Sequence, residues 1–231
     1  MVNLFQQQEL GLEKLIRRDI FYQRRKIWLK VKVLRIIYVT GSPGTGKTST
    51  ALKLAVLLKG KHVDLGEVCL RKNFLLGYDK KRKSRIVDLN RLEKYVKNLI
   101  LKTDKTLVFD AHFLVRLPTN LNPLIFVLRC EPLKLAERLR LKGFSEEKIY
   151  ENVWAEILDF CLQEALAFYD PKQIHEVDTT NKNVDEVVEE MLEVVKGNKK
   201  PVVGVYDWIK ILEKEGKLEE LMVWGEKFRV I

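Results

Sequence analysis

Gly41-Ser42-Pro43-Gly44-Thr45-Gly46-Lys47-Thr48 matches the pattern Gly-x-x-x-x-Gly-Lys-[Ser/Thr] of a phosphate-binding loop. Its glycines allow the backbone to curl, so that successive N–H groups point inward at a polyphosphate. Lys47 is expected to reach the β- and γ-phosphates of a nucleoside triphosphate, and the Thr48 hydroxyl is expected to hold Mg²⁺. The stretch therefore predicts a nucleotide-binding site, provided that its flanks have the right structure.

The flanks of this loop have the expected character. Residues 33–40 are a largely β-branched apolar run, which is typical of a buried parallel strand. Residues 48–58 carry apolar side chains at helical spacing, and Gly60 ends that pattern. A strand, a loop and a helix follow one another in the order that the motif requires.

Further strands and helices alternate along the chain. This alternation predicts an α/β fold with a five-stranded parallel sheet, helices on both faces and right-handed crossovers. Residues 67–85 read as irregular, with a turn at 77–79. After the first strand and helix, we expect strands at 62–66, 106–110, 124–129 and 173–177, and helices at 89–101, 132–141, 145–169 and 183–195.

Several polar residues fall at or just after the carboxyl ends of these strands, where open α/β sheets bind ligands. They are Lys47, Asp110, His112 and Arg129. Asp110 closes an apolar strand as a Walker B carboxylate does and would hold Mg²⁺ directly or through water, although a helix cap is an alternative. His112 would orient a water or sense the γ-phosphate, or else make a structural hydrogen bond.

A second basic group precedes Gly143. Arg138, Arg140 and Lys142 would form a lid that closes on ATP, and the alternative is a solvated helix surface.

The composition suits a soluble globular protein. The chain has 231 residues, of which 46% are hydrophobic and 32% charged, enough for one domain with appendages or two small ones. No apolar stretch reaches the roughly 18 residues of a membrane span, and the first residues lack a signal-peptide core. Three cysteines without Cys-x-x-Cys spacing argue against disulfides or zinc, so we expect a cytoplasmic location.

The net charge of +10 is concentrated in two segments. Residues 1–32 hold eight Lys/Arg against three Asp/Glu, and residues 70–85 hold seven against one. These patches indicate contact with a polyanion such as RNA or phosphates, or else solvated lysine-rich surfaces. The first patch would be an RNA-contacting arm, a helix packed on the body, or a stretch added by an upstream start codon.

The organisation that follows has three parts. Residues 1–32 form a basic helical extension, 33–196 a nucleotide-binding domain, and 197–231 a linker with a C-terminal helical extension. The last segment contains Trp208 and Trp224 but is too short for a core of its own. We therefore expect it to dock on the body or on a partner.

Several blocks together resemble the adenylate kinase isoenzyme 6 family, also called the coilin-interacting nuclear ATPase protein, over about residues 33–195. Besides the loop, the blocks are Gly77-Tyr78-Asp79, Ile86-Val87-Asp88, Asp110-Ala111-His112, Val127-Leu128-Arg129, Glu137-Arg138-Leu139, Gly143-Phe144-Ser145-Glu146-Glu147-Lys148, Glu151-Asn152-Val153, Ala155-Glu156-Ile157 and Glu164-Ala165.

The resemblance implies a P-loop nucleoside monophosphate kinase-like fold, with a monophosphate-binding segment at 64–87 and a short lid at 141–151. It implies reversible phosphate transfer between ATP and AMP, ATP hydrolysis with Mg²⁺, and a role in late maturation of the small ribosomal subunit and its rRNA. The family binds a platform ribosomal protein transiently, and its eukaryotic members are nuclear.

The family's site residues carry over to matching positions. The expected catalytic residues are Lys47, Asp110 and His112, and the metal ligands are Thr48 and Asp110. The expected nucleotide-binding residues are Gly41, Gly44, Thr45, Gly46, Lys47, Thr48, Ser49, Arg138 and Lys142.

The chain departs from the family at three places. Lys142 stands where an ATP-contacting arginine is frequent, and Leu70 stands where some members place an arginine on the monophosphate. Lys80-Lys81-Arg82-Lys83 is basic where relatives are acidic, which favours RNA. The alternatives to a ribosomal ATPase are a metabolic small-molecule kinase and a nucleotide-gated binding module.

Overall fold

The computed structural model describes residues 36–80, 84–118 and 121–226. The chain divides into Met1–Leu34 and Arg35–Ile231, and only the second unit contains described residues. The predicted helical extension at 1–32 therefore lies outside them. None of the described helices is long and apolar enough to cross a membrane.

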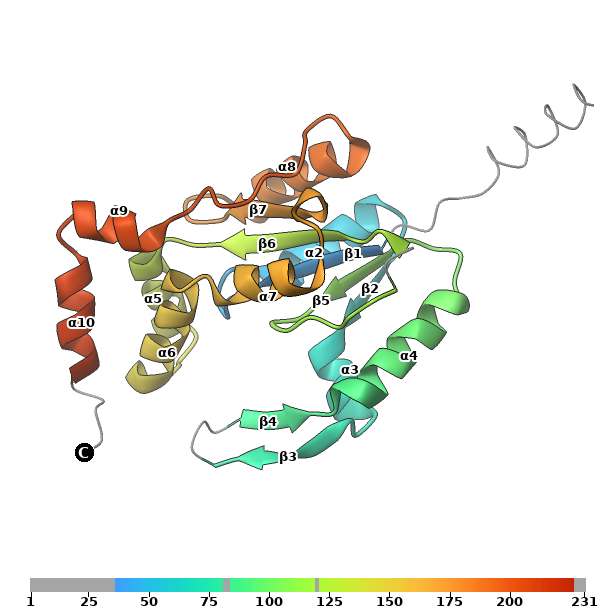
Figure 1. The fold of residues 1–231 in the computed structure, drawn as a ribbon, viewed down its shortest axis with the longest axis horizontal. Helices are drawn as coiled ribbons and strands as arrows, with labels where there is room; N and C mark the ends of the chain where they lie inside the picture. Colours follow the sequence, from blue (N-terminus) through green and yellow to red (C-terminus); the bar gives the residue numbers. More distant parts are fainter. Residues whose placement is uncertain (1–35, 81–83, 119–120, 227–231) are drawn as a thin grey trace, which may run out of the picture. The chain divides into compact units, whose positions relative to one another are not determined.

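The predicted five-stranded sheet is confirmed. Its strands are β1 (Ile36–Gly41), β2 (Lys61–Asp64), β5 (Leu107–Asp110), β6 (Leu124–Arg129) and β7 (Ile174–Asp178). They pair in parallel in the order β2-β5-β1-β6-β7, so β1 occupies the centre (Figure 1). The chain passes from β1 to β2 and β5 on one side of β1, and then to β6 and β7 on its other side. Because the strand order reverses at β1, a crevice opens at the carboxyl end of this strand. The phosphate-binding loop starts at this point.

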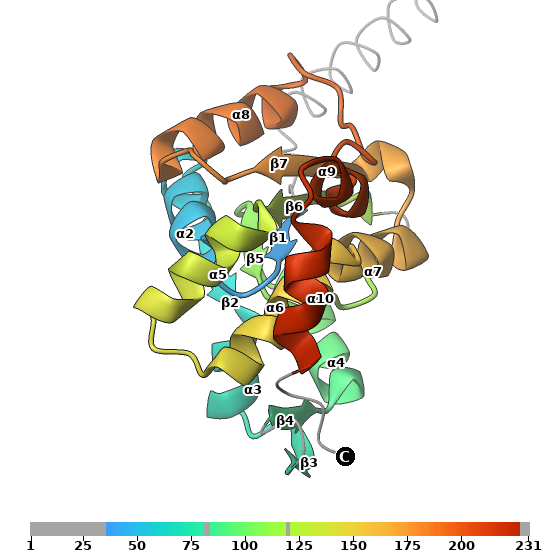
Figure 2. The same ribbon diagram turned by 90° about the vertical axis from the view of Figure 1, so that its left-hand side faces the viewer.

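Helices cover both faces of the sheet (Figure 2). Ala51, Leu54 and Ala55 of α2 (Lys47–Leu57) pack with Val188 and Met191 of α8 (Val184–Lys196) in one apolar core cluster with the sheet. The opposite side carries α4 (Leu89–Leu101) and α7 (Phe160–Phe168). The spaced apolar residues of each helix thus form a stripe that faces the sheet.

The prediction for residues 67–85 was wrong. This segment contains α3 (Leu65–Arg71) and an antiparallel hairpin of β3 (Leu75–Asp79) and β4 (Ser84–Val87), set apart from the main sheet (Figure 1). The predicted turn at 77–79 belongs to β3, and the connection falls between Asp79 and Ser84. The hairpin is solvated on most of its surface, so its sequence lacks the apolar alternation that predicts a strand.

The single long helix predicted at 145–169 is two helices. Helix α6 (Glu146–Ile157) and α7 are separated at Asp159, which adopts a left-handed conformation with φ 56°. Aspartate tolerates this region better than most residues. Its carboxylate pairs with Arg129 at the end of β6, and this long-range contact has no signature in the local apolar spacing.

The C-terminal segment docks on the body. Helices α9 (Trp208–Lys214) and α10 (Leu218–Glu226) place Trp208, Leu212 and Leu221 in an apolar cluster with α5 (Pro132–Leu141) and α6. This cluster gives the aromatic residues of the segment the burial that so short a segment could not provide by itself.

Candidate nucleotide-binding site

The loop between β1 and α2 has the curled backbone that its glycines allow. Gly41, Gly44 and Gly46 have φ values of 144°, 93° and 92°. A Cβ on Gly41 would lie 2.5 Å from the Leu128 carbonyl oxygen, and one on Gly44 would lie 2.9 Å from Leu135 Cδ1. Both positions therefore need glycine, because the loop passes close to β6 and α5.

Lys47 begins α2 and turns back over the loop. Its Nζ donates to the carbonyl oxygen of Ser42 at 3.1 Å. Burial lowers the pKa of the Lys47 ammonium group, and the negative charge of Asp110 opposes that shift. Thr48 and Ser49 are exposed on the first turn of α2, at its positive end. The arrangement presents an amine, two hydroxyls and a helix N-terminus to one region.

Asp110 closes β5 beside β1, in register with Val39, and is 3% exposed. Its Oδ2 has no hydrogen-bond partner among the described residues, and Nε2 of His62 lies 3.6 Å away. A buried carboxylate oxygen without a donor suits a hard cation such as Mg²⁺. Asp110 and the exposed hydroxyl of Thr48 therefore fit the metal ligands expected from the sequence.

His112 is exposed two residues after Asp110 and packs edge-on against Phe113. Partial desolvation by the surrounding protein lowers the pKa of its imidazole, and the positive charge of Lys47 lowers it further against the opposing charge of Asp110. The imidazole is therefore held neutral near pH 7. These interactions bring the three predicted catalytic side chains into one electrostatic neighbourhood.

A cavity of about 360 Å³ adjoins the loop. Arg138 reaches it from α5, donating through Nη2 to the Thr179 carbonyl at 2.5 Å and the Thr180 carbonyl at 2.8 Å. The sequence pointed to Arg138 but not to the loop after β7. The lining consists of Gly44, Thr45, Gly46, Thr50, Arg138, Thr179, Lys182, Asn183, Val184 and Val187.

The proposed lid is the corner between α5 and α6. Arg140 is engaged there, with its Nε 2.8 Å from Glu146 Oε1. Gly143 turns the chain with φ 76°, and Ser145 caps α6. Lys142 lies near enough for its charge to act on Lys47. The lid at 141–151 and the monophosphate segment at 64–87 stay predictions about function.

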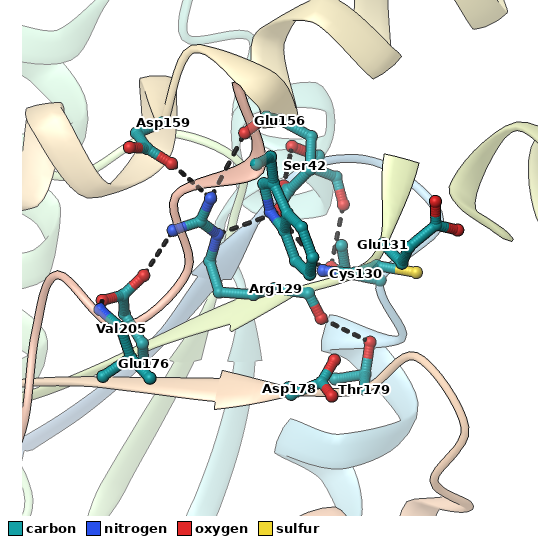
Figure 3. Close-up of polar contacts among 12 residues, drawn as sticks. Ser42, Arg129, Cys130, Glu131, Glu156, Asp159, Glu176, Asp178, Thr179 and Val205 are labelled. Carbon is teal, nitrogen blue, oxygen red and sulfur yellow. Dashed lines mark hydrogen bonds and ion pairs between the residues drawn. The ribbon is translucent and has the colours of Figure 1, made fainter. Parts of the chain in front are cut away.

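Arg129 does not point into the candidate site. It is 1% exposed and forms ion pairs with Glu156, Glu176 and Asp159 (Figure 3). These carboxylates raise the pKa of its guanidinium against the effect of burial. Arg129 therefore lies behind the site and has a structural role there. The carboxylates that pair with it are far away in the sequence, so no spacing pattern predicts these ion pairs.

The chain is similar to a known protein family and to several known proteins. A family model described as an AAA domain matches residues 37–159. The chain is 39% identical over 179 residues to the "Putative adenylate kinase" of Pyrococcus furiosus, covering 78% of this chain and 94% of that protein. It is 37% identical over 173 residues to the protein of the same name from Methanocaldococcus jannaschii, covering 74% and 92%.

The chain is also similar to a eukaryotic protein. The chain is 36% identical over 151 residues to the adenylate kinase isoenzyme 6 homolog of Schizosaccharomyces pombe, covering 65% of this chain and 84% of that protein. This chain belongs to the adenylate kinase isoenzyme 6 family of P-loop kinases.

Proposed function

We propose that this protein binds ATP with Mg²⁺, transfers its γ-phosphate reversibly to AMP, and also hydrolyses ATP. The observation that carries the proposal is the Lys47 amine, held 3.1 Å from Ser42 O inside the loop that follows β1, the strand that pairs with the one ending in Asp110. Phosphoryl transfer depends on positioned phosphates and on cations that neutralise the transition state. The loop and Lys47 supply both from this chain.

The remaining residues have consistent roles. Backbone N–H groups from Gly44 to Ser49 would cradle the phosphates, and Thr48 and Asp110 would hold Mg²⁺, which neutralises phosphate charge when bound. The neutral imidazole of His112 would orient the attacking water. The cavity beside Arg138 is of a size that suits a nucleoside, so we assign it to the base and ribose of ATP.

The proposal places AMP against the segment 64–87. Arg71 lies on the last turn of α3, exposed and 3.3 Å from Glu67 in a surface ion pair. Surface pairs of this kind are weak, so the guanidinium can exchange its partner for a phosphate. Arg71 would then act in place of the arginine that some family members have at the position of Leu70.

We further propose that ATP hydrolysis serves maturation of the small ribosomal subunit, in the cytoplasm or, in a eukaryote, the nucleus. The support is the basic segment of residues 70–85, which includes most of the hairpin of β3 and β4. Its described residues expose Leu76 by 69% and Tyr78 by 57% between basic side chains. Cationic and stackable groups together suit a ribosomal protein–rRNA surface.

Two measurements test the proposal. ATP turnover with Mg²⁺ should occur without AMP, increase with AMP, and disappear in Lys47→Ala. Co-sedimentation with small ribosomal subunits should differ between ATP and ADP. A rate that depends wholly on AMP, with no sedimentation in either state, would instead identify a metabolic kinase.

A further inference from the structure

Behind the phosphate-binding loop lies a buried cluster with more negative than positive charge. One guanidinium, that of Arg129, pairs with the carboxylates of Glu156, Glu176 and Asp159 (Figure 3). Glu156 and Glu176 are each 2% exposed. Buried carboxylates are costly unless they accept hydrogen bonds, so this cluster needs further donors.

Residues 201–224 of the C-terminal segment supply two of those donors. The Val205 amide donates to Glu176 Oε2 at 3.0 Å, and the Trp208 indole Nε1 donates to Glu156 Oε1 at 3.1 Å. The Trp208 ring also lies over the Arg129 guanidinium, 5.9 Å from its carbon, and stacks on Tyr206. The segment thus contacts both the anions and the cation of the cluster.

Glu156 connects the C-terminal segment to the phosphate-binding loop. Its Oε1 also accepts from Arg129 Nε at 2.8 Å and from the Cys130 amide at 3.2 Å. Its other oxygen, Oε2, accepts from the Ser42 hydroxyl at 2.6 Å. Ser42 is buried within the motif, and among the described residues its hydroxyl donates to Glu156 alone.

Ser42 in turn organises the part of the loop that meets the phosphates. Its carbonyl oxygen accepts from Lys47 Nζ at 3.1 Å, from the Thr45 amide at 3.2 Å and from the Thr45 hydroxyl at 2.8 Å. A continuous series of hydrogen bonds therefore runs from Trp208 through Glu156 and Ser42 to Lys47. Networks of this kind in a low-dielectric interior respond together when one member is removed.

We propose that Glu156 is a positioning residue of the phosphate-binding loop and that Trp208 of the C-terminal segment holds Glu156 in place. The segment is then part of the nucleotide site, although it contributes no group that touches the nucleotide. The inference deepens the proposed ATP binding, but its structural half, the hold on the loop, applies to the nucleotide-free protein as well.

The test makes the same change, tryptophan to phenylalanine, at two positions. Trp208→Phe removes the indole N–H and keeps an aromatic ring in the apolar cluster. Trp154→Phe is the matched control, because Trp154 packs against the same cluster two residues before Glu156, and its Nε1 has no hydrogen-bond partner among the described residues. Ser42→Ala and the double variant Ser42→Ala/Trp208→Phe complete a cycle.

Two readouts separate this inference from the proposed function. Hydrogen exchange of the backbone amides of residues 41, 42 and 44–47, in protein without nucleotide, should accelerate in Trp208→Phe and not in Trp154→Phe, while exchange of α8 stays unchanged. The Kd for ATP with Mg²⁺ should rise about fivefold in Trp208→Phe, the low end of measured coupling between sites. In the Ser42→Ala background, Trp208→Phe should add less than twofold.

The outcomes are decisive in each direction. Equal loop exchange in the two tryptophan variants, or faster exchange throughout Trp208→Phe including α8, overturns the positioning role. Additive effects of Ser42→Ala and Trp208→Phe on the Kd overturn the route through Glu156. If the unaltered protein fails to bind ATP, the proposed function falls, and the exchange measurement still decides whether Trp208 holds the loop.

Discussion

The ammonium group of Lys47 donates to the carbonyl oxygen of Ser42, five residues earlier, at 3.1 Å. The side chain therefore folds back along its own loop, toward the place where the inward N–H groups converge. A bound triphosphate would replace one peptide carbonyl with several charged oxygens, and charge-assisted hydrogen bonds are the stronger kind. The loop thus holds the lysine near its working position before nucleotide arrives.

Lys47→Ala should abolish this contribution. We expect ATP turnover to fall by about 100-fold or more, the usual effect of removing a group that stabilises transition-state charge. Lys53→Ala is the control on the same helix, because Lys53 pairs with Asp185 near the surface. Steady-state ATPase assays check both, and a similar loss in the two variants would contradict the assignment.

Asp110→Asn should raise the Mg²⁺ concentration that turnover requires. The substitution keeps the shape of a side chain that is 3% exposed but removes its negative charge. We expect the Mg²⁺ concentration for half-maximal turnover to rise about tenfold, since Mg²⁺ binds through only one or two carboxylates. Titration of Mg²⁺ at fixed ATP measures this, and an unchanged midpoint would leave Asp110 a purely structural strand end.

Arg138→Ala should weaken nucleotide binding more than Arg140→Ala does. Arg138 spans the cavity edge and donates to the Thr179 and Thr180 carbonyls, so its loss disturbs the lining. We expect the Kd for ATP to rise about tenfold, in line with a lost charged hydrogen bond. Calorimetric titration compares the variants.

Arg140 lies two residues further along the same helix and provides the comparison for Arg138. It forms an exposed pair with Glu146, and such pairs contribute at most about 1 kcal/mol. Its replacement should leave ATP affinity within about twofold. A larger effect of Arg140→Ala than of Arg138→Ala would mean that the lid, and not the cavity, controls binding.

Protonation of His175 should make the protein less stable as the pH falls below about 6.5. Its buried Nδ1 accepts from the Val202 amide at 3.1 Å, which requires neutral imidazole. Burial lowers the pKa of His175, Lys199 lowers it further, and Glu190 and Glu176 oppose the shift. The unfolded chain therefore binds more protons between the lowered pKa and 6.5, so the contribution of neutral His175 to stability is fully present above that window and is lost as the pH falls through it.

Urea unfolding at several pH values between 5 and 7.5 measures this effect. His175→Gln retains an acceptor for Val202 but does not titrate, so its free energy of unfolding should depend less steeply on pH than that of the unaltered protein. Parallel pH profiles for the two proteins would show that His175 does not contribute.

Local patterns predicted most of the sheet. Each of its central strands is a continuous apolar run, because it is buried on both faces, and the loop motif joins the first of them to its helix. The hairpin of β3 and β4 was missed because its strands are largely solvated. The break at Asp159 was missed because apolar spacing continues through it while the cause, a pairing with Arg129, lies 30 residues away.

By itself, the sequence determined that this chain builds a central parallel sheet, ends β1 in a phosphate-binding loop and places Lys47 and Asp110 at neighbouring strand ends. Those features follow from short-range rules of backbone geometry and burial. Only the tertiary structure decided that Arg129 faces inward, that the Thr179 loop lines the cavity, and that Trp208 reaches Glu156. Hydrogen bonds between side chains up to 114 positions apart leave no periodic mark, because packing alone brings their atoms together.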